Sequence, residues 1–382
     1  MKIGLAIYNF DPKKGGAERY TYDLAVRLAA KGHHVYVFCV NGVEAAGVTI
    51  VPLKTYSHPR WLRNLSFALA HRQAAGKVRP DVLLGYGNVF DLDVFQSHGG
   101  VHDVWIQREI ASYEKGLLRV IKKVLLKFNV NQIIQRKMEE YAVETCRSKR
   151  MIAISDMVRD HFSSHYGIDK QHFDVVYNGV DIERFKPAAD PLPGPAVKIL
   201  FSAGNFRLKG LGPLIRALGN VVRQGKDVRL IVMGRGKKEY FRALIDQEKL
   251  GDLVTFTGEH SAPEDIYRQA HIFINPTYYD SYSLTTVEAM ASGLPVITTR
   301  WAGASCFVSP EEGYVINDPE DIGALSAAII ALTDPARRRA MGENARKKVE
   351  SLTMEKNADQ IENILLRVFQ EKRNSERVNS KE

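Results

Sequence analysis

Residues Tyr278–Val296 read YYDSYSLTTVEAMASGLPV and lie between two short apolar runs, Ile272–Asn275 and Val296–Thr298. Ser281 is a residue type that favours the N-cap of a helix, and the Gly-Leu-Pro sequence near the end of the stretch favours its termination. A helix between two apolar strands is the repeating unit of parallel sheets. The stretch therefore predicts one strand–helix–strand unit of an α/β fold.

Two carboxylates in this stretch have positions that suit a ligand site. Asp280 lies in the loop before the predicted helix, and Glu288 lies two turns into it. The unpaired amides at the helix start, those of Ser283, Leu284 and Thr285, are expected to bind a phosphate. Glu288 would accept hydrogen bonds from sugar hydroxyls, with Asp280 on the far side of the same ligand. The alternative is a solvated helix acid and a turn residue without a ligand.

The same alternation of apolar runs and amphipathic stretches continues along the 382 residues of the chain. Helical patterns occupy Glu18–Lys31, Leu211–Arg223 and Ala324–Leu332. Besides the two runs above, the expected strands are Ile3–Tyr8, Val35–Val40, Val82–Leu84, Met151–Ile154, Val175–Tyr177, Ile199–Ala203, Leu230–Met233 and Val254–Thr257. Alternation of this kind predicts doubly wound parallel sheets with helices on both faces.

A proline-rich segment divides the chain. Residues 186–196 read KPAADPLPGPA, and four prolines in such a short span prevent both a helix and a central strand. We therefore expect a first domain over residues 1–185, a linker, and a second domain over residues 197–353. A final helix over Met354–Arg373 is expected to pack back on the first domain. Two doubly wound domains bind ligands at the carboxyl ends of their strands, so a cleft between them is the expected site.

The charge of the chain is uneven. The formal net charge is +9, and residues 1–185 contain 26 Lys and Arg against 19 Asp and Glu. This excess suggests an anionic partner for the first domain. No zinc-finger spacing, RNA-recognition motif or basic zipper accompanies it, so nucleic acid is not the expected partner.

The remaining composition favours a cytoplasmic globular protein. Cys39, Cys146 and Cys306 are too far apart for a metal site or a disulfide framework, which favours a reducing compartment. The first apolar run is short and is followed by Asp11, so it predicts a strand rather than a signal peptide. No apolar run approaches the roughly 18 residues that a membrane-spanning helix needs.

Five motifs in order resemble one enzyme family. They are GGAERY (15–20), NGVDIERFKP (178–187), SAGNFRLKG (202–210), VMGRG (232–236) and the stretch from residue 278 onward. Together they resemble the retaining glycosyltransferases of family 4, in which an acid, seven residues and a glutamate precede an Ala-Met-Ala-x-Gly-x-Pro-Val run. Within that family, EKGLLR (114–119) and the general layout look most like the lipopolysaccharide core glucosyltransferase I group. The resemblance implies the GT-B fold, two Rossmann-like domains facing a cleft.

The resemblance implies roles for residues outside the central stretch. Lys209 and Arg207 would neutralise the diphosphate leaving group, whose charge grows as the glycosidic bond breaks. Their spacing is shorter than is usual in the family; the alternative is a basic loop before a helix. Gly15 and Gly16 would allow close approach of a phosphate or sugar before a helix start, although a plain turn would use the same residues. Gly234 would lie near the nucleobase.

Two further positions also have plainer explanations. His98 follows a strand, and the resemblance places it, or less strongly His102, near the donor sugar; a lone histidine is more often structural. Asp91–Asp93 forms an Asp-x-Asp pattern that could bind a metal ion. That motif belongs to a single-domain glycosyltransferase fold, and Lys209 and Arg207 already supply positive charge, so we expect no metal and no cofactor.

Residues 117–128, LLRVIKKVLLKF, form an amphipathic pattern with apolar residues on one face and cations on the other. From residue 115 to residue 137 there are seven cations and no acid. One interpretation is a surface helix packed on its own domain. The other, which the positive charge of this half and the resemblance to the core glucosyltransferases favour, is an interfacial segment over residues 117–137 on anionic lipid, which would make the protein peripheral to the inner face of the cell membrane.

These observations predict a retaining hexosyltransferase with His98, Asp280 and Lys209 at the reacting centre. By the resemblance alone, the expected donor is UDP-glucose, and the expected acceptor is a saccharide or lipid-linked saccharide such as the lipopolysaccharide inner core. A mannosyl- or other hexosyltransferase of polysaccharide or glycolipid synthesis is the alternative. A nucleotide-sugar epimerase and an inactive nucleotide-binding protein are further alternatives; Asp280, where the family more often has Glu, is the one feature favouring the latter.

Overall fold

The computed structural model describes residues 1–146, 150–189 and 194–379 and forms two compact units. The first unit contains Met1–Ile106, Val120–Gly179 and the segment from Met354 onward. The second unit contains Val180–Thr353 together with Gln107–Arg119. Each unit is built on its own parallel sheet with its own apolar core.

The first sheet has the strand order β5-β3-β1-β6-β7-β8-β9, and all of its pairings are parallel. Its strands are β1 (Lys2–Ala6), β3 (His34–Cys39), β5 (Val48–Pro52), β6 (Val82–Gly85), β7 (Val94–Ser97), β8 (Arg150–Ala153) and β9 (Phe173–Val175). The short strands β2 (Asn9–Phe10) and β4 (Asn41–Gly42) pair separately. The order reverses between β1 and β6, where doubly wound sheets bind their ligands.

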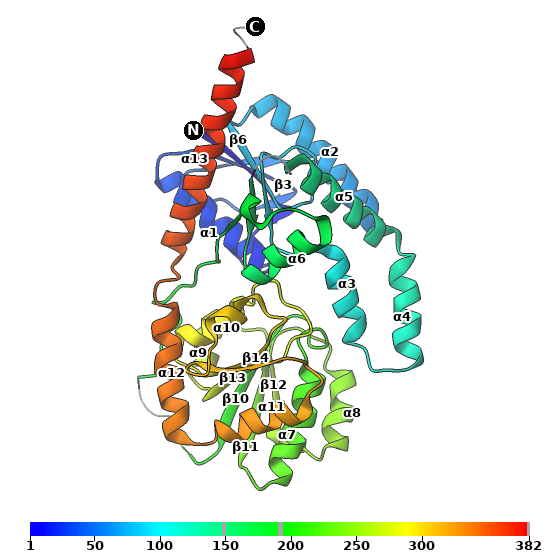
Figure 1. Cartoon of the computed structure of the whole chain (residues 1–382), viewed down its shortest axis with the longest axis vertical. Helices are drawn as coiled ribbons and strands as arrows, with labels where there is room; N and C mark the ends of the chain where they lie inside the picture. Colours follow the sequence, from blue (N-terminus) through cyan, green and yellow to red (C-terminus); the bar gives the residue numbers. More distant parts are fainter. Residues whose placement is uncertain (147–149, 190–193, 380–382) are drawn as a thin grey trace. The chain divides into compact units, whose positions relative to one another are not determined.

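Helices connect and cover the strands of this unit. They are α1 (Gly16–Ala30), α2 (Arg60–Val78), α3 (His102–Ala111), α4 (Leu117–Lys127), α5 (Val130–Cys146), α6 (Asp156–Tyr166), the 3-10 helix η1 (Lys170–His172) and α13 (Met354–Asn379). Of these, the end of α3 from Gln107 and the start of α4 up to Arg119 belong to the second unit. Figure 1 shows α13 beside α1, and Lys31, the C-cap of α1, pairs with Asp359 and Glu362 of α13. The apolar face of α13, including Ile361 and Leu365, is buried in the core of the first unit.

The second sheet has the strand order β12-β11-β10-β13-β14-β15 and is also parallel. Its strands are β10 (Val197–Ser202), β11 (Val228–Met233), β12 (Val254–Gly258), β13 (Ile272–Asn275), β14 (Val296–Thr299) and β15 (Gly313–Ile316). Its order is that of a Rossmann domain, and it reverses between β10 and β13. The loops that follow these two strands are therefore the expected ligand-binding loops of the second unit.

The helices of the second unit lie between its strands or after them. They are α7 (Leu211–Arg223), α8 (Glu239–Gln247), η2 (Gly251–Leu253), α9 (Pro263–Tyr267), α10 (Leu284–Ala291), η3 (Gly303–Phe307), α11 (Ile322–Ala331) and α12 (Pro335–Val349). Helix α7 is the most deeply buried, with Leu211, Leu214, Ile215 and Leu218 inaccessible to solvent.

The predicted fold class is confirmed, since two doubly wound parallel sheets are present. Every expected strand overlaps an observed one, but β2, β4, β5, β7 and β15 were not among the expected runs. The first two have only two residues each, and the other three carry Pro52, Gln96 or Gly313, which interrupt their apolar pattern. The observed unit boundary lies at Gly179, and the expected linker 186–196 falls partly outside the described residues. Helix α13 continues beyond the expected end to Asn379.

Candidate active site

The two loops at the reversal point of the second sheet carry Lys209 and Asp280. Lys209 lies between β10 and α7, and Asp280 lies between β13 and α10. Because β10 and β13 are adjacent in the sheet, their carboxyl ends and the loops that follow lie side by side. The fold therefore brings together two residues that are far apart in the sequence.

Backbone contacts hold these loops against each other. The carbonyl of Leu208 accepts hydrogen bonds from the Tyr278 amide, at 2.9 Å, and from the Thr277 hydroxyl, at 3.2 Å. Gly210 has a φ of 83°, and a Cβ placed on it would lie 2.0 Å from the carbonyl oxygen of Pro276. Only glycine fits this close approach. The position of Lys209 is thus fixed by a backbone contact on each side of it in the chain.

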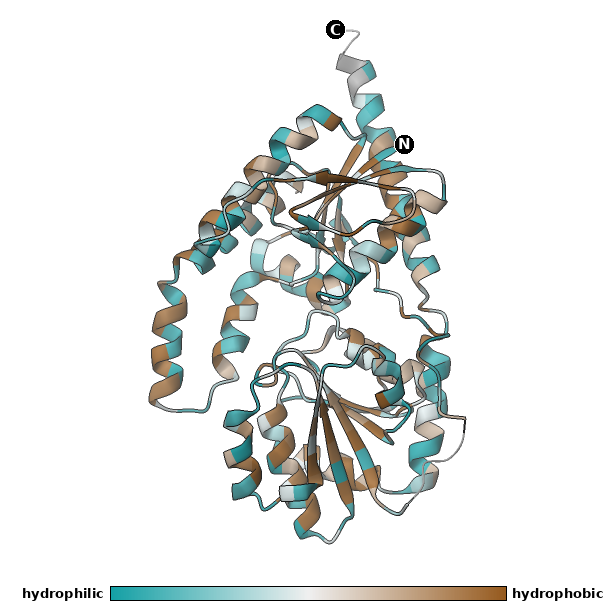
Figure 2. Ribbon diagram, turned by 180° about the vertical axis from the view of Figure 1, so that it is seen from behind, coloured by the Kyte–Doolittle hydropathy of each residue, from teal (hydrophilic) through white to brown (hydrophobic). Residues whose placement is uncertain are grey.

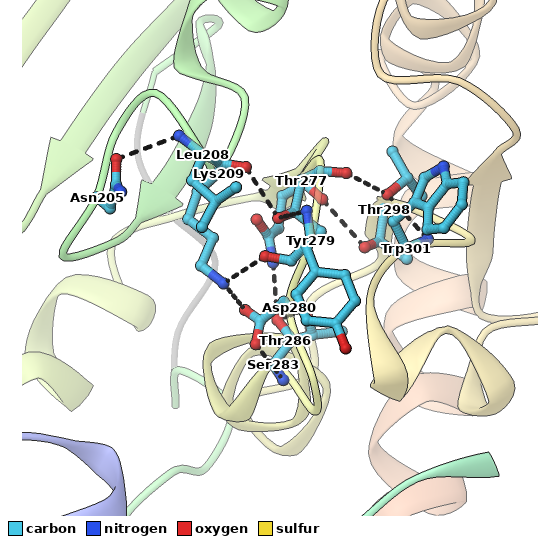
Figure 3. Close-up of polar contacts among 12 residues, drawn as sticks. Asn205, Leu208, Lys209, Thr277, Tyr279, Asp280, Ser283, Thr286, Thr298 and Trp301 are labelled. Carbon is cyan, nitrogen blue, oxygen red and sulfur yellow. Dashed lines mark hydrogen bonds and ion pairs between the residues drawn. The ribbon is translucent and has the colours of Figure 1, made fainter. Parts of the chain in front are cut away.

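Lys209 and Asp280 form an ion pair that also involves the start of α10 (Figure 3). The Nζ of Lys209 lies 2.7 Å from Oδ2 of Asp280 and donates a hydrogen bond to the Tyr279 carbonyl at 3.0 Å. The Oδ1 of Asp280 accepts a hydrogen bond from the Ser283 amide at 2.9 Å. One carboxylate therefore contacts both the ammonium group and the first amide of the helix start, the two groups predicted to bind an anionic ligand.

The start of α10 differs from the prediction in one respect. The N-cap is Ser283, in the left-handed conformation with φ 71°, and not Ser281. The Ser283 hydroxyl points inward, accepting a hydrogen bond from Asn275 at 2.7 Å and lying 2.8 Å from the Thr286 hydroxyl. Because the Ser283 amide is bonded to Asp280, it is not an open phosphate donor. The amides of Leu284 and Thr285 lie in the first helical turn, where a helix offers no acceptor of its own.

Glu288 lies on α10 and is half-buried. Its Oε2 accepts a hydrogen bond of 2.9 Å from the hydroxyl of Tyr267, the last residue of α9. Glu288 is therefore not the freely solvated helix acid of the alternative interpretation. Its role toward a sugar stays a prediction.

Arg207 and Gly234 have surroundings that the sequence did not indicate. The guanidinium of Arg207 lies 4.2 Å from the ring centroid of Tyr113 and 5.5 Å from that of Tyr240, so it contacts two aromatic rings rather than Asp280. Gly234 has a φ of 122°, and a Cβ placed on it would lie 1.9 Å from the carbonyl oxygen of Ala203. Glycine is therefore required where the loop after β11 crosses the end of β10, whatever lies next to it.

Sequence reasoning missed Arg108 and Trp301. The Arg108 guanidinium stacks 3.8 Å from the Trp301 ring centroid, and its Nε donates to the Tyr278 carbonyl at 2.8 Å. The Trp301 carbonyl in turn accepts the Asp280 amide at 2.8 Å. Arg108 thus supports the loop that carries Asp280, and its burial lowers its pKa. No motif contains Arg108, and α3 carries polar or charged residues at half of its ten positions, so the sequence offered no signal for it.

In the first unit, Gly15 and Gly16 lie at the start of α1, after β2, and His98 directly follows β7. Gly15 is the N-cap of α1 and Gly16 is its first residue, so the helix begins two residues earlier than the expected start at Glu18. The His98 ring lies between the rings of Tyr20 and Tyr86, with centroid distances of 4.7 and 4.8 Å. Burial lowers the pKa of His98 to about 4, so its imidazole is neutral near pH 7. A neutral ring between tyrosines suits a hydrogen bond to a sugar better than charge pairing with a phosphate.

The other polar candidates of the first unit have structural partners. Asp91 pairs with Arg72 at 3.0 Å, and Asp93 pairs with Lys372 at 2.9 Å while accepting the Leu83 amide. Within residues 1–146, 150–189 and 194–379, no cluster of three acidic, histidine or cysteine side chains could hold a metal ion.

His102, the weaker histidine candidate, is the first residue of α3. Its amide donates to both oxygens of Glu139 at 3.1 Å, and its ring stacks on Trp105. Burial lowers the pKa of His102 and raises that of Glu139 to about 7. These contacts give His102 a structural role at the start of α3.

Helix α4 exposes the apolar face identified in the sequence. Leu117, Leu118, Leu125 and Phe128 are 75%, 69%, 63% and 71% exposed, and Val120, Ile121 and Val124 are also exposed. Figure 2 shows this helix at the left edge, with brown apolar residues and teal polar residues along it. The interpretation of a helix packed on its own domain is therefore wrong for this face.

Among the cations of α4, Arg119 already has hydrogen-bond partners within the protein, since its guanidinium donates to the carbonyls of Tyr113 and Ala111. No helix in the described part of the chain is long and apolar enough to cross a membrane.

Two family patterns match adjacent parts of the chain. The Glycosyltransferase Family 4 pattern matches residues 14–184, and the pattern of the Glycosyl transferases group 1 matches residues 184–348. Both describe glycosyltransferases, and together they span most of the sequence, including every motif quoted above.

Individual relatives agree with this match. Lipopolysaccharide glucosyltransferase WaaG of Escherichia coli K12 is 24% identical over 364 residues, covering 91% of this chain and 93% of its own. The crystal structure of WaaG superposes with a TM-score of 0.77 at 21% identity, covering 95% and 99% of the two chains. The Anabaena HepE structure with UDP and glucose has a TM-score of 0.69 at 17% identity, covering 96% and 99%.

A further relative matches over a shorter region. D-inositol 3-phosphate glycosyltransferase of Corynebacterium kroppenstedtii is 31% identical over 218 residues, which cover 51% of this chain. The match spans about half of that relative, 48% of its length.

Proposed function

The chain belongs to the glycosyltransferases with the GT-B fold, and we propose that it transfers a glucosyl group from UDP-glucose to a saccharide or lipid-linked saccharide, with retention of anomeric configuration. The full-length similarity to WaaG supports a lipopolysaccharide inner-core acceptor. The HepE complex with UDP and glucose supports the donor, since the two chains share their fold. A family 4 hexosyltransferase with another acceptor is the alternative, favoured by the similarity to the inositol-phosphate enzyme.

The observation that carries the proposal is the contact of Lys209 with Asp280 at the start of α10. An ammonium group and helix amides at one point of a Rossmann sheet form a binding site for phosphate. A diphosphate there would contact Lys209 and the amides of Leu284 and Thr285. Glu288 would accept hydrogen bonds from hydroxyl groups of the donor, and Asp280 would contact the sugar.

The chemical step follows from these positions. The bond between the anomeric carbon and the diphosphate oxygen breaks, and the acceptor hydroxyl oxygen forms the new bond on the same face. The acceptor proton passes to an oxygen of the departing diphosphate, whose developing charge Lys209 stabilises. His98, whose neutral ring lies between Tyr20 and Tyr86, would form a hydrogen bond with the sugar. We expect this chemistry to need no metal ion, because Lys209 and the helix start supply the positive charge.

The membrane is the second proposed partner. The exposed apolar face of α4 and the cations Lys122, Lys123 and Lys127 suit the surface of an anionic bilayer, where each cation contributes about 1 kcal/mol. A lipid-linked acceptor would lie in the same surface. We therefore place the enzyme at the cytoplasmic face of the cell membrane as a peripheral protein.

Thermal-shift measurements with UDP-, GDP- and ADP-sugars test the donor. A donor present at 100 times its Kd should stabilise the protein by about 2.7 kcal/mol. Selective stabilisation by UDP-glucose, followed by transfer to an inner-core acceptor in the presence of EDTA, is the expected result. Isomerisation of the donor without acceptor would indicate an epimerase, and binding without turnover an inactive nucleotide-binding protein. Stabilisation by none of these sugars would contradict the proposal.

A further inference from the structure

Tyr267 is a fully buried tyrosine beside the candidate site, and no motif includes it. Its ring stacks on Phe273 of β13 with 6.0 Å between centroids and 24° between planes. Phe185 packs edge-on against the same ring at 5.4 Å. Aromatic contacts on two sides fix the ring, so its hydroxyl can point in only one direction.

The hydroxyl of Tyr267 lies at the reversal point of the second sheet. It donates a hydrogen bond of 2.9 Å to Oε2 of Glu288, and the Ser202 side chain is another polar partner. Ser202 is the last residue of β10, directly before the loop that carries Lys209. The phenol therefore links the end of this strand to the carboxylate of α10.

Burial and the nearby Glu288 carboxylate raise the pKa of Tyr267 well above 10. The phenol consequently keeps its proton at any physiological pH and acts as a permanent donor. A carboxylate accepts about four hydrogen bonds through its two oxygens. Glu288 can therefore be held by Tyr267 and still accept hydrogen bonds from two neighbouring hydroxyls of a ligand.

We infer that Tyr267 is a positioning residue for donor binding, which holds the Glu288 carboxylate in the orientation that receives the hydroxyl groups of the nucleotide sugar. The inference rests on the proposed function, because it deepens the role of Glu288 there. A glutamate has several rotatable bonds, and fixing it before the ligand arrives removes an entropic cost from binding. The effect should appear in donor affinity more than in the chemical step.

The NGVDIERFKP motif contacts Tyr267 and the helix that carries it. Its Phe185 is the edge-on ring, and its Arg184 pairs with Glu264 of α9 at 2.8 Å. Arg346 of α12 donates to the carbonyls of Phe185 and Ala291, at 2.8 and 2.7 Å, and so ties the motif to the end of α10. The motif thus has a local function in the second unit, that of fixing α9 against α10.

The experiment compares Tyr267→Phe with Tyr314→Phe in the full chain. Tyr314 of β15 is half-buried in the same unit, and its hydroxyl contacts Arg337 at 3.4 Å, outside the site. We expect Tyr267→Phe to raise the KM for the donor and the Kd for UDP-glucose about tenfold, with kcat changed less than threefold. Tyr314→Phe should change neither. In the Glu288→Ala background, Tyr267→Phe should have less than a twofold effect, because the group it positions is gone.

An unchanged Kd for Tyr267→Phe, or an equal loss in both backgrounds, would overturn the inference while leaving the proposed function intact. If the wild-type protein binds no nucleotide sugar when the Kd is measured by calorimetry, the proposed function is overturned, and the inference with it. If Tyr267→Phe does not fold, Glu288→Asp tests the same contact from the other side. It withdraws the carboxylate from the phenol, and a Kd raised less than twofold would count against the inference.

Discussion

The ammonium of Lys209 and the carboxylate of Asp280 are 2.7 Å apart, and the same carboxylate accepts the amide of Ser283 at 2.9 Å. The protein's own acid thus occupies a position that contacts both a cation and a helix start. A diphosphate that binds here must share these partners with Asp280 or displace it. Because Asp280 and a diphosphate would compete for the same partners, substitutions of Lys209 and of Asp280 should have different effects on binding and transfer.

Replacing Lys209 by Ala should lower kcat by about 100- to 1000-fold, because a positive charge at the departing diphosphate is lost. The melting temperature should change little, since the group is partly exposed. Lys237, an exposed lysine of the same unit, supplies the matched control Lys237→Ala. Steady-state transfer assays with the radiolabelled donor provide the measurement. A loss of less than tenfold would remove Lys209 from the reacting centre.

Asp280→Asn should have opposite effects on two measurements. The amide oxygen can still accept the Ser283 amide, but the charge that pairs with Lys209 disappears. We expect UDP alone to bind more tightly by calorimetry, because Lys209 no longer has an internal anion, whereas transfer should fall at least tenfold. Weaker UDP binding together with full transfer would show that Asp280 does not compete for Lys209.

Gly210→Ala should destabilise the second unit and misplace Lys209. At φ 83° the new Cβ would meet the Pro276 carbonyl at 2.0 Å. Gly225 has a similar φ of 75°, and no atom lies within 4 Å of the place that a new Cβ would take, so Gly225→Ala isolates the conformational cost of about 1 kcal/mol. Denaturant titration of both variants should show at least twice that loss for Gly210→Ala. Equal losses would mean that the loop moves aside easily.

The stability of the protein should depend on the protonation of His98. Burial lowers its folded-state pKa from 6.5 to about 4. Between pH 6.5 and 4 the unfolded chain therefore binds more protons, so the free energy of unfolding falls as the pH falls, by up to about 1.4 kcal/mol per unit. His98→Asn should flatten this dependence relative to wild type. NMR titration of the ring provides the direct measurement, and a midpoint near 6.5 would contradict the burial argument.

Vesicle binding should depend on the cations of α4. Changing Lys122, Lys123 and Lys127 to Glu should abolish sedimentation with vesicles of acidic lipid at low salt, because attraction to the surface becomes repulsion. The same charge change at Arg339, Lys347 and Lys348 of α12 provides the matched control. Binding that survives the first set, or that both sets abolish equally, would contradict a specific role for α4.

The sequence by itself determined the fold class and most elements of both sheets, because apolar periodicity and glycine or proline at element ends are local properties. It also indicated Lys209 and Asp280 in loops between a strand and a helix, and Glu288 within the helix that follows Asp280, since all three lie in motifs that resemble one family. The tyrosine contacts of Arg207 and the use of the Ser283 amide by Asp280 were not predictable in this way.

Only the tertiary structure decided which of these residues meet. Lys209 contacts Asp280 because β10 pairs with β13, and Glu288 contacts Tyr267 because α9 packs beside α10. Arg108 reaches Trp301 from a segment far away in the chain. Strand order and helix packing arise from the burial of apolar surface by the whole chain, so a local sequence pattern does not determine them.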